Sequence, residues 1–202
     1  MVVATGAMPR RLGIQGEQHI TKSDQFLELE ALLRRIVFIE GCYISFEFAH
    51  IALRAQAEIT ILHRGQRLLE GFDPDLANQL VNRPKRLGAR IEVGMEVMVV
   101  EKSDGKLLVH ASTADTRSMF EADLVVQGAG RVPELDDSNL AAAGVQAEER
   151  GVEVNEYLQS ISNPAVYAAG DAASSGLPPV AGYEGKLWHR TSGTVITEKS
   201  SI

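Results

Sequence analysis

The feature that most constrains the fold is an apolar run at residues 36–39, which leads through a tight turn into an amphipathic helix. The run is continuously apolar, as in a strand buried on both faces of a parallel sheet. A second strand is predicted over residues 57–62, and it ends in the basic turn 63–67, His-Arg-Gly-Gln-Arg. The helix between the strands carries apolar residues at helical spacing, at Ile44, Phe48, Ile51, Ala52 and Ala55. This order predicts a βαβ unit.

The rest of the chain alternates predicted helices and short strands. Ser23-Asp24 is expected to cap a helix through about Leu33. Asp73 is expected to cap another, which Pro84 should end or kink because proline lacks the backbone donor. Strands are expected at 2–4, 90–93, 97–101, 107–111, 118–122, 124–126, 151–154 and 165–169, with those from 97 to 122 forming an antiparallel meander. A loop with a short helix is expected over 131–150, and from Lys186 the chain is polar and patternless.

Composition sets limits on the partners. The chain has 202 residues, 45% of them hydrophobic and 23% charged, which allows one or two globular domains. A net charge of −7 gives no reason to expect nucleic acid or an anionic membrane as a partner. No apolar run reaches membrane-spanning length. The single cysteine, Cys42, allows no intrachain disulfide, so a cytoplasmic setting is the default expectation.

The turn after the first strand has the spacing of a dinucleotide-binding loop. Such a loop places glycines so that the backbone approaches a pyrophosphate at a helix N-terminus. In register, the three glycine positions are Glu40, Cys42 and Ser45. A carboxylate about 4 Å from the pyrophosphate costs roughly 1–4 kcal/mol per unit charge. Strain at a glycine position adds on the order of 1–3 kcal/mol, so binding is expected to weaken by about a hundredfold.

The end of the second strand favours one nicotinamide cofactor over the other. An acid there binds the ribose of NAD, whereas arginine accommodates the 2′-phosphate of NADP. This chain has His63, Arg64 and Arg67, and no acid before Glu70. The residues therefore favour NADP over NAD, and the alternative is a solvated basic turn.

Four segments together resemble one known family. They are Ala-Thr-Gly-Ala-Met-Pro at 4–9, Gly-Cys-Tyr-Ile-Ser-Phe-Glu at 41–47, Gly-Ala-Gly-Arg-Val-Pro at 128–133 and Val-Tyr-Ala-Ala-Gly-Asp at 166–171. In this order they resemble the chain exit from the FAD domain, the nucleotide-binding turn, the return segment and the second FAD motif of the pyridine nucleotide–disulfide oxidoreductases. These are the glutathione reductase-like flavoproteins.

The resemblance implies an α/β fold with a Rossmann-like NAD(P)-binding domain, in which a parallel sheet carries an antiparallel meander. Residues 1–33 would be the exit segment and linker of the FAD domain, and residues 34–130 the NAD(P)-binding domain. Residues 131–185 would be a partial second segment of the FAD domain, with 186–202 an unassigned tail.

The resemblance also implies roles for single residues. Tyr43 would gate the nicotinamide pocket, Glu47 would lie near the carboxamide, and Asp171 would contact the ribityl chain of FAD. Alternatively, Tyr43 packs at the helix start, Glu47 is an exposed acid and Asp171 caps a helix. The full expected cofactor-binding set is Gly41, Tyr43, Ile44, Ser45, Glu47, His63, Arg64, Arg67, Gly130, Gly170 and Asp171.

Some family features have no counterpart in this sequence. The N-terminal glycine-rich FAD motif, the CxxxxC redox pair and the C-terminal interface domain with its His–Glu pair are missing. Cys42 lacks a resolving partner, so it is interpreted as a replaced glycine rather than a reactive thiol. No cluster has metal-ligand spacing, and no nucleophile–base pair is evident. Gln56 stands where a glycine would end the helix.

These observations favour an FAD- and NAD(P)H-dependent oxidoreductase that transfers hydride from NADPH to FAD and then to an unknown acceptor. As a truncated chain with an incomplete FAD site it is expected to be impaired or inactive. Two alternatives remain open. One is a non-catalytic nucleotide-binding or interaction module that pairs with itself or with a partner chain. The other is a decaying, marginally folded remnant.

Overall fold

The computed structural model describes residues 1–173 and 178–192 of the chain. The fold divides into two compact units. The larger unit is Pro9–Gly130, and the smaller unit joins Met1–Met8 to the segment from Arg131 onward. Residues 9–33, which the sequence grouped with the preceding segment, therefore lie in the larger unit.

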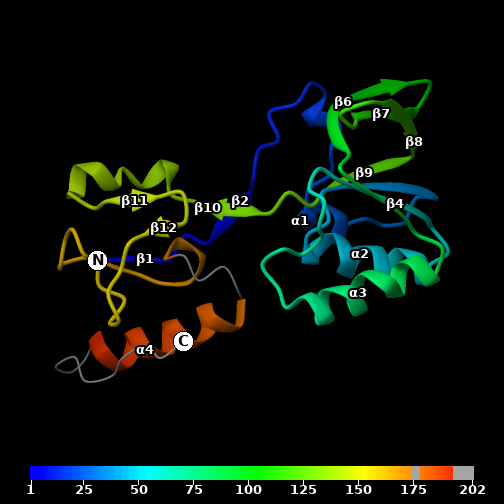
Figure 1. Ribbon diagram of the computed structural model, residues 1–202. Coiled ribbons are helices and arrows are strands. Elements are labelled where there is room, and N and C mark those ends of the chain that lie inside the picture. The colour runs from blue at the N-terminus through cyan, green and yellow to red at the C-terminus, as the bar shows by residue number, and fades with distance from the viewer. Residues whose placement is uncertain (174–177, 193–202) are drawn as a thin grey trace. The chain divides into compact units, whose positions relative to one another are not determined.

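A four-stranded parallel sheet forms the centre of the larger unit (Figure 1). Its middle strand β3 (Arg35–Ile39) pairs with β4 (Glu58–His63) on one side and with β9 (Leu124–Gln127) on the other. β5 (Arg90–Val93) lies beyond β4, which gives the order β5-β4-β3-β9. The predicted α/β class and the βαβ unit are confirmed.

Helices cover one face of this sheet and a meander covers the other (Figure 1). The helices are α1 (Ser23–Leu27), α2 (Tyr43–Arg54) and α3 (Pro74–Arg86), preceded by the short 3-10 turn η1 (Glu17–His19). The meander is β6 (Glu96–Ser103), β7 (Lys106–Ser112) and β8 (Arg117–Ala122), antiparallel as predicted. Side chains of β3 alternate between two cores because successive residues of a strand point to opposite faces. Ile36 and Phe38 join the helix side, and Val37 and Ile39 join the meander side.

Short pairs of strands make up the smaller unit. β1 runs parallel to β13, β2 pairs with β10, and β11 pairs with β12. A separate apolar core, which includes Val3, Val152 and Ala168, lies among them. The elements are β1 (Val2–Val3), β2 (Ala7–Pro9), β10 (Arg131–Pro133), η2 (Asp136–Ser138), η3 (Leu140–Ala143), β11 (Ala147–Glu148), β12 (Gly151–Val152), β13 (Tyr167–Ala168), η4 (Gly170–Ala172) and α4 (Pro178–Ser192).

Two predicted helix boundaries are wrong. α1 ends at Leu27 rather than near Leu33, and Lys22 takes the N-cap position in place of Ser23. A helix reaching Leu33 would leave only Arg34 to turn the chain into β3. α3 begins after the Asp73 cap as predicted but continues to Arg86, past Pro84. Pro84 lies in the last turn of α3, where only Lys85 and Arg86 follow it in the helix.

The expected patternless tail is partly helical. α4 extends through Lys186 to Ser192, and residues 193–202 lie outside the described part of the chain. On α4, Glu184 and Leu187 are both buried, three residues apart on one face. The Glu184 carboxylate accepts a hydrogen bond from the Gly170 N–H at 2.7 Å. A buried acid in an apolar stripe hides the helical period from a sequence reading.

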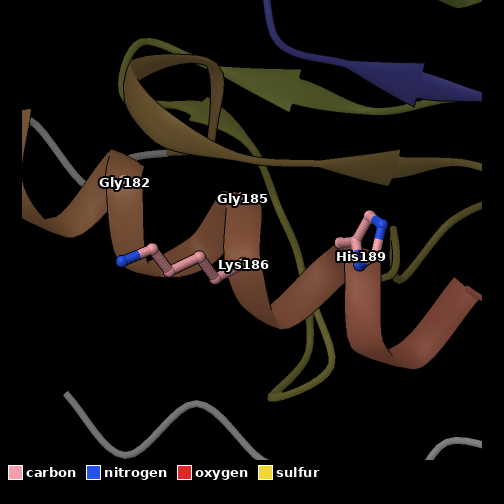
Figure 2. A pocket seen from close by; sticks show the side chains of 4 residues that line it. All are labelled: Gly182, Gly185, Lys186 and His189. Atoms are coloured by element: carbon pink, nitrogen blue, oxygen red, sulfur yellow. The ribbon is translucent and has the colours of Figure 1, made fainter.

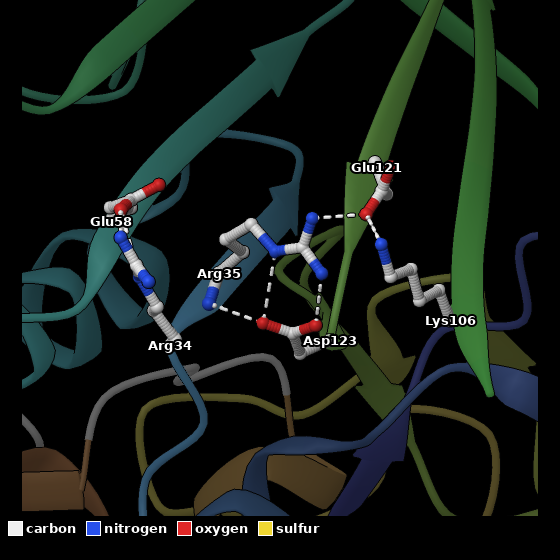
Figure 3. A network of polar contacts seen from close by, with 6 residues as sticks. All are labelled: Arg34, Arg35, Glu58, Lys106, Glu121 and Asp123. Atoms are coloured by element: carbon white, nitrogen blue, oxygen red, sulfur yellow. Dashed lines mark hydrogen bonds and ion pairs between the residues drawn. The ribbon is translucent and has the colours of Figure 1, made fainter.

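An ion-pair network connects β3 to the meander strand β8 (Figure 3). The Asp123 carboxylate accepts hydrogen bonds from the Arg35 backbone N–H at 2.9 Å and from Arg35 Nε at 3.0 Å, and it pairs with the guanidinium. Glu121 pairs with both Arg35 and Lys106. Hydrogen bonds from Arg35 lower the pKa of the Asp123 carboxyl below its ordinary value. The nearby Arg34–Glu58 pair is exposed to solvent by comparison.

Asp123→Asn should lower the melting temperature by a few degrees at neutral pH, because the arginine loses its charged acceptor. Since the folded pKa of Asp123 is depressed, its contribution is present above about pH 4 and is lost as pH falls through the folded pKa. Urea unfolding at pH 7 and near pH 3 measures this. Glu58→Gln is the control, and its exposed pair should change stability by less than about 0.5 kcal/mol. Equal effects of the two substitutions at pH 7 would contradict the assignment.

α2 ends in a left-handed residue that is not glycine. Gln56 has φ 65°, and its N–H donates to the Leu53 carbonyl at 3.0 Å. The next N–H, of Ala57, donates to the Ala52 carbonyl at 3.0 Å. This is the Schellman arrangement, which favours glycine at this position.

Gln56→Gly should stabilise the chain by about 1 kcal/mol, because glycine adopts positive φ without the clash of a Cβ. Gln56→Ala is the matched control. Alanine keeps the Cβ and should give no such gain. Chemical denaturation of both variants is the measurement, and equal stabilisation by both would show that the positive φ carries no strain.

Candidate functional site

The turn between β3 and α2 contains a strained residue at its first glycine position. Glu40 has φ 69°, in the left-handed region that favours glycine, and its N–H donates to the Leu62 carbonyl at 2.8 Å. The following Gly41 is buried, and a Cβ there would lie 2.3 Å from Leu68 Cδ2. The turn therefore has the path expected of a glycine-rich loop, with Glu40 where the tight turn needs glycine.

Cys42 is accommodated more easily than the sequence suggested. It is the N-cap of α2 with φ −85° and ψ 176°, an extended conformation open to any residue. The expected backbone strain therefore falls on Glu40 and not on Cys42. Helical residues begin at Tyr43, and the first N–H groups of a helix lack intrahelical acceptors. This end of α2 is where an anion would be stabilised by the helix dipole.

Ser45 fixes the helix against the sheet. Its hydroxyl donates to the Glu40 carbonyl at 2.7 Å, and the side chain is fully buried. Gly128, at the end of β9, donates its N–H to the Ile39 carbonyl at 2.7 Å. A Cβ on Gly128 would lie 1.8 Å from Ser45 Oγ. Gly128 is thus a structural residue of the site. It lies in the return segment at 128–133, where only Gly130 was expected to contact a cofactor.

The Glu40 carboxylate is directed to the end of β4. Glu40 Oε2 lies 2.5 Å from His63 Nδ1, and Oε1 lies 3.7 Å from Arg64 Nε. The side chains of Glu40 and His63 are largely shielded, at 19% and 16% exposed, whereas that of Arg64 is 73% exposed. From the sequence, the Glu40 carboxylate was expected to lie near a bound pyrophosphate. The structure pairs it with the basic turn.

The surroundings of His63 favour its charged form. His63 Nδ1 faces the Glu40 carboxylate, and Nε2 lies 3.0 Å from the Arg67 carbonyl oxygen. Both oxygens only accept, so a ring with two N–H groups satisfies both contacts. The contact of the Gly41 N–H with Nδ1 is longer, at 3.4 Å, and fits only the neutral ring. The hydrogen bond to Glu40 raises the pKa of His63 above its ordinary value, against the opposing effect of burial.

The remaining predicted residues of the larger unit surround this turn less closely. Arg67 is exposed and donates to the Glu70 carbonyl at 2.6 Å. Tyr43 and Ile44 are half-buried against the helix-side core, and Glu47 is exposed on α2. Gly130, with φ 85°, lies at the boundary of the unit.

Two predicted residues belong to the smaller unit. Gly170, with φ 67°, is buried at the start of η4, where its N–H is bonded to Glu184. Asp171 is half-buried and follows it in the first turn of η4. A shallow hollow in this unit is lined by Gly182, Gly185, Lys186 and His189, all on α4 (Figure 2). Among the described residues a single helix lines this hollow, and we assign no ligand to it.

Residues 1–190 match the sequence pattern of the family described as pyridine nucleotide-disulphide oxidoreductase. The chain belongs to this family. It is 34% identical over 202 residues to a glutathione reductase of Burkholderia cepacia, covering 99% of this chain and 43% of the relative. It is 31% identical over 194 residues to a mercuric reductase of Lysinibacillus sphaericus, covering 92% and 35%.

Solved structures share the fold of this family member. The HOCl-induced flavoprotein disulfide reductase RclA of Escherichia coli superposes with a TM-score of 0.83 at 20% identity, covering 98% of this chain and 45% of that one. Its Cu(II) complex superposes with a TM-score of 0.85 at 21% identity, covering 99% and 46%. The chain thus spans less than half the length of these relatives.

The described residues contain neither a metal-binding cluster nor a membrane-spanning helix. No group of three or more His, Cys, Asp or Glu side chains within residues 1–173 and 178–192 could hold a metal ion. Among the helices described here, none is long and apolar enough to cross a membrane.

NMR titration of the His63 ring should give a pKa above 6.5, and Glu40→Gln should lower it. Because the folded pKa is raised, the His63 contribution to stability is present below about pH 6.5 and is lost as pH rises through the folded pKa. Glu58→Gln is the control variant and should leave the His63 pKa unchanged, because Glu58 begins β4, at the opposite end of the strand from His63. A His63 pKa at or below 6.5 would show that the ring is neutral beside Glu40.

Proposed function

We propose that this chain binds NADPH at the turn between β3 and α2 and serves an FAD-dependent oxidoreductase. In this activity hydride passes from NADPH to FAD and then to an acceptor whose identity stays open. The observation that carries the proposal is the β3–α2–β4 unit, in which a helix N-terminus and a cationic strand end flank one turn. A helix N-terminus binds a pyrophosphate, and a cationic strand end binds a 2′-phosphate.

The residues around the turn fit the adenine half of the nucleotide. Gly128 has no room for a side chain, because a Cβ there would lie 2.6 Å from the Glu40 carbonyl oxygen, so the helix stays close to the sheet. His63, Arg64 and Arg67 supply positive charge where the 2′-phosphate would lie. On this basis NADP is the preferred cofactor over NAD.

The roles at the nicotinamide and flavin rest on the family. Tyr43 would stand beside the nicotinamide, and Glu47 would hydrogen-bond its carboxamide. Asp171, after Gly170 in η4, would bind the ribityl chain of FAD. When bound, the flavin supplies the redox chemistry, while these residues bind and orient. Residues 34–130 would then be the nucleotide-binding domain, and 131–185 part of the flavin-binding domain.

The visible spectrum of the purified chain tests the whole proposal. We expect a flavin absorption band after loading with FAD, and bleaching of that band on anaerobic addition of NADPH. A flavin band that NADPH leaves unchanged would contradict hydride transfer. A chain that takes up no flavin would restrict the proposal to nucleotide binding.

The double variant Arg64→Gln, Arg67→Gln should weaken NADPH binding by about tenfold or more and leave NADH binding nearly unchanged. The reason is that charge-assisted bonds to the 2′-phosphate are lost while the ribose contacts remain. Calorimetric titration measures both affinities. Arg34→Gln is the control, because Arg34 pairs with Glu58 at the opposite end of the parallel strands. Equal losses for both nucleotides would argue against a 2′-phosphate site.

A non-catalytic interaction module is a second candidate. Among the described residues, β1 pairs with β13 on one edge and no strand pairs with its other edge, and an unpaired strand edge can pair with another chain. A homodimer or a complex with a partner chain would pair this edge. Size-exclusion chromatography with light scattering tests this, and a monomer across the accessible concentrations would contradict self-association.

A further inference from the structure

The Glu40 carboxylate reaches the basic turn at 63–67, to which the proposed function assigns the 2′-phosphate. The carboxylate contacts His63 at 2.5 Å and approaches Arg64 at 3.7 Å. These are two of the three cationic side chains available there to a nucleotide. An anion is therefore already bound at the turn, and this chain supplies it.

We propose that Glu40 is a specificity-determining residue, whose carboxylate competes with the 2′-phosphate of NADPH for His63 and Arg64. The inference rests on the proposed function and deepens it. The basic residues favour binding of NADPH over NADH, and Glu40 reduces this difference in affinity.

The backbone of Glu40 is held so that its carboxylate stays at this place. Its N–H is bonded to the Leu62 carbonyl at 2.8 Å, and its carbonyl accepts from Ser45 Oγ at 2.7 Å. The positive φ of 69° sets the direction in which the side chain leaves the backbone. Because the Glu40 and His63 side chains are mostly shielded from water, their attraction is screened less than that of a surface pair.

The two nicotinamide cofactors meet this carboxylate differently. A 2′-phosphate carries a charge of about −1.5 to −2 near neutral pH and accepts hydrogen bonds, so it is repelled by a carboxylate and must displace it from the cations. A ribose 2′-hydroxyl can donate to a carboxylate, as in NAD-specific sites. Glu40 therefore penalises NADPH and is neutral or favourable toward NADH.

Small probes isolate the 2′-phosphate from the rest of the nucleotide. We would measure binding of 2′,5′-ADP and of 5′-AMP to the full chain by calorimetry at about pH 6, below the ordinary pKa of histidine. The variants are Glu40→Gln, which keeps the size of the side chain, and Glu40→Asn, whose residue tolerates positive φ. Glu58→Gln is the control, because Glu58 begins β4, at the opposite end of the strand from His63, and pairs with Arg34.

Both Glu40 variants should bind 2′,5′-ADP about tenfold more tightly than the unaltered chain, with less than about a twofold change for 5′-AMP. Glu58→Gln should change neither probe by more than about twofold. An equal gain for both probes would place the effect of Glu40 on the 5′-phosphate and overturn the inference alone. No gain for 2′,5′-ADP in either variant would also overturn it. Failure of every protein to bind either probe would contradict the proposed function itself, and the inference with it.

Discussion

The structure depends on β3, the strand that is hydrogen-bonded on both edges and buried on both faces. Its neighbours β4 and β9 hold it in register from Arg35 to Ile39, and its side chains enter two separate cores. Such a strand cannot slip by one residue without exchanging its two faces. Its carboxyl end, and the turn that follows, are therefore placed with little freedom. The position of Glu40 is a consequence of this packing.

That constraint explains how a charged residue survives at a position that favours glycine. The turn is held in its path by two hydrogen bonds of Glu40, from its N–H to the Leu62 carbonyl and from the Ser45 hydroxyl to its own carbonyl. Glu40 therefore adopts a positive φ at a cost of the order of 1–2 kcal/mol. The carboxylate finds a partner in His63, which offsets part of this cost and holds a positive charge at the end of β4.

Much of the larger unit could be predicted from sequence. The β3–α2–β4 unit, the Asp73 cap and the meander follow from periodicity and turn residues, which are local signals. The left-handed conformations of Glu40 and Gln56 followed from recognising glycine positions filled by other residues. Local signals failed where tertiary contacts decide. α1 is cut short by the entry into β3, and α4 contains a buried acid whose partner, Gly170, lies outside the helix.

The site shows the same division. The spacing of the dinucleotide-binding loop identified the turn residues and the basic end of the second strand. Each of these features lies within a single short segment of the sequence. The pairing of Glu40 with His63 depends on a side-chain direction that is set by a positive φ and by the β3–β4 register, which no spacing rule reports. The close contact of Ser45 with Gly128 joins segments far apart in the chain and was missed for that reason.

The measurement that tests the central claim most directly is a titration of the full chain with NADP⁺, followed by amide NMR. The account predicts shifts concentrated in two segments, at 43–45 on the first turn of α2 and at 64–67 after β4, with little change in the meander. Shifts absent from both segments at saturating NADP⁺, or centred on another part of the chain, would contradict nucleotide binding at this turn.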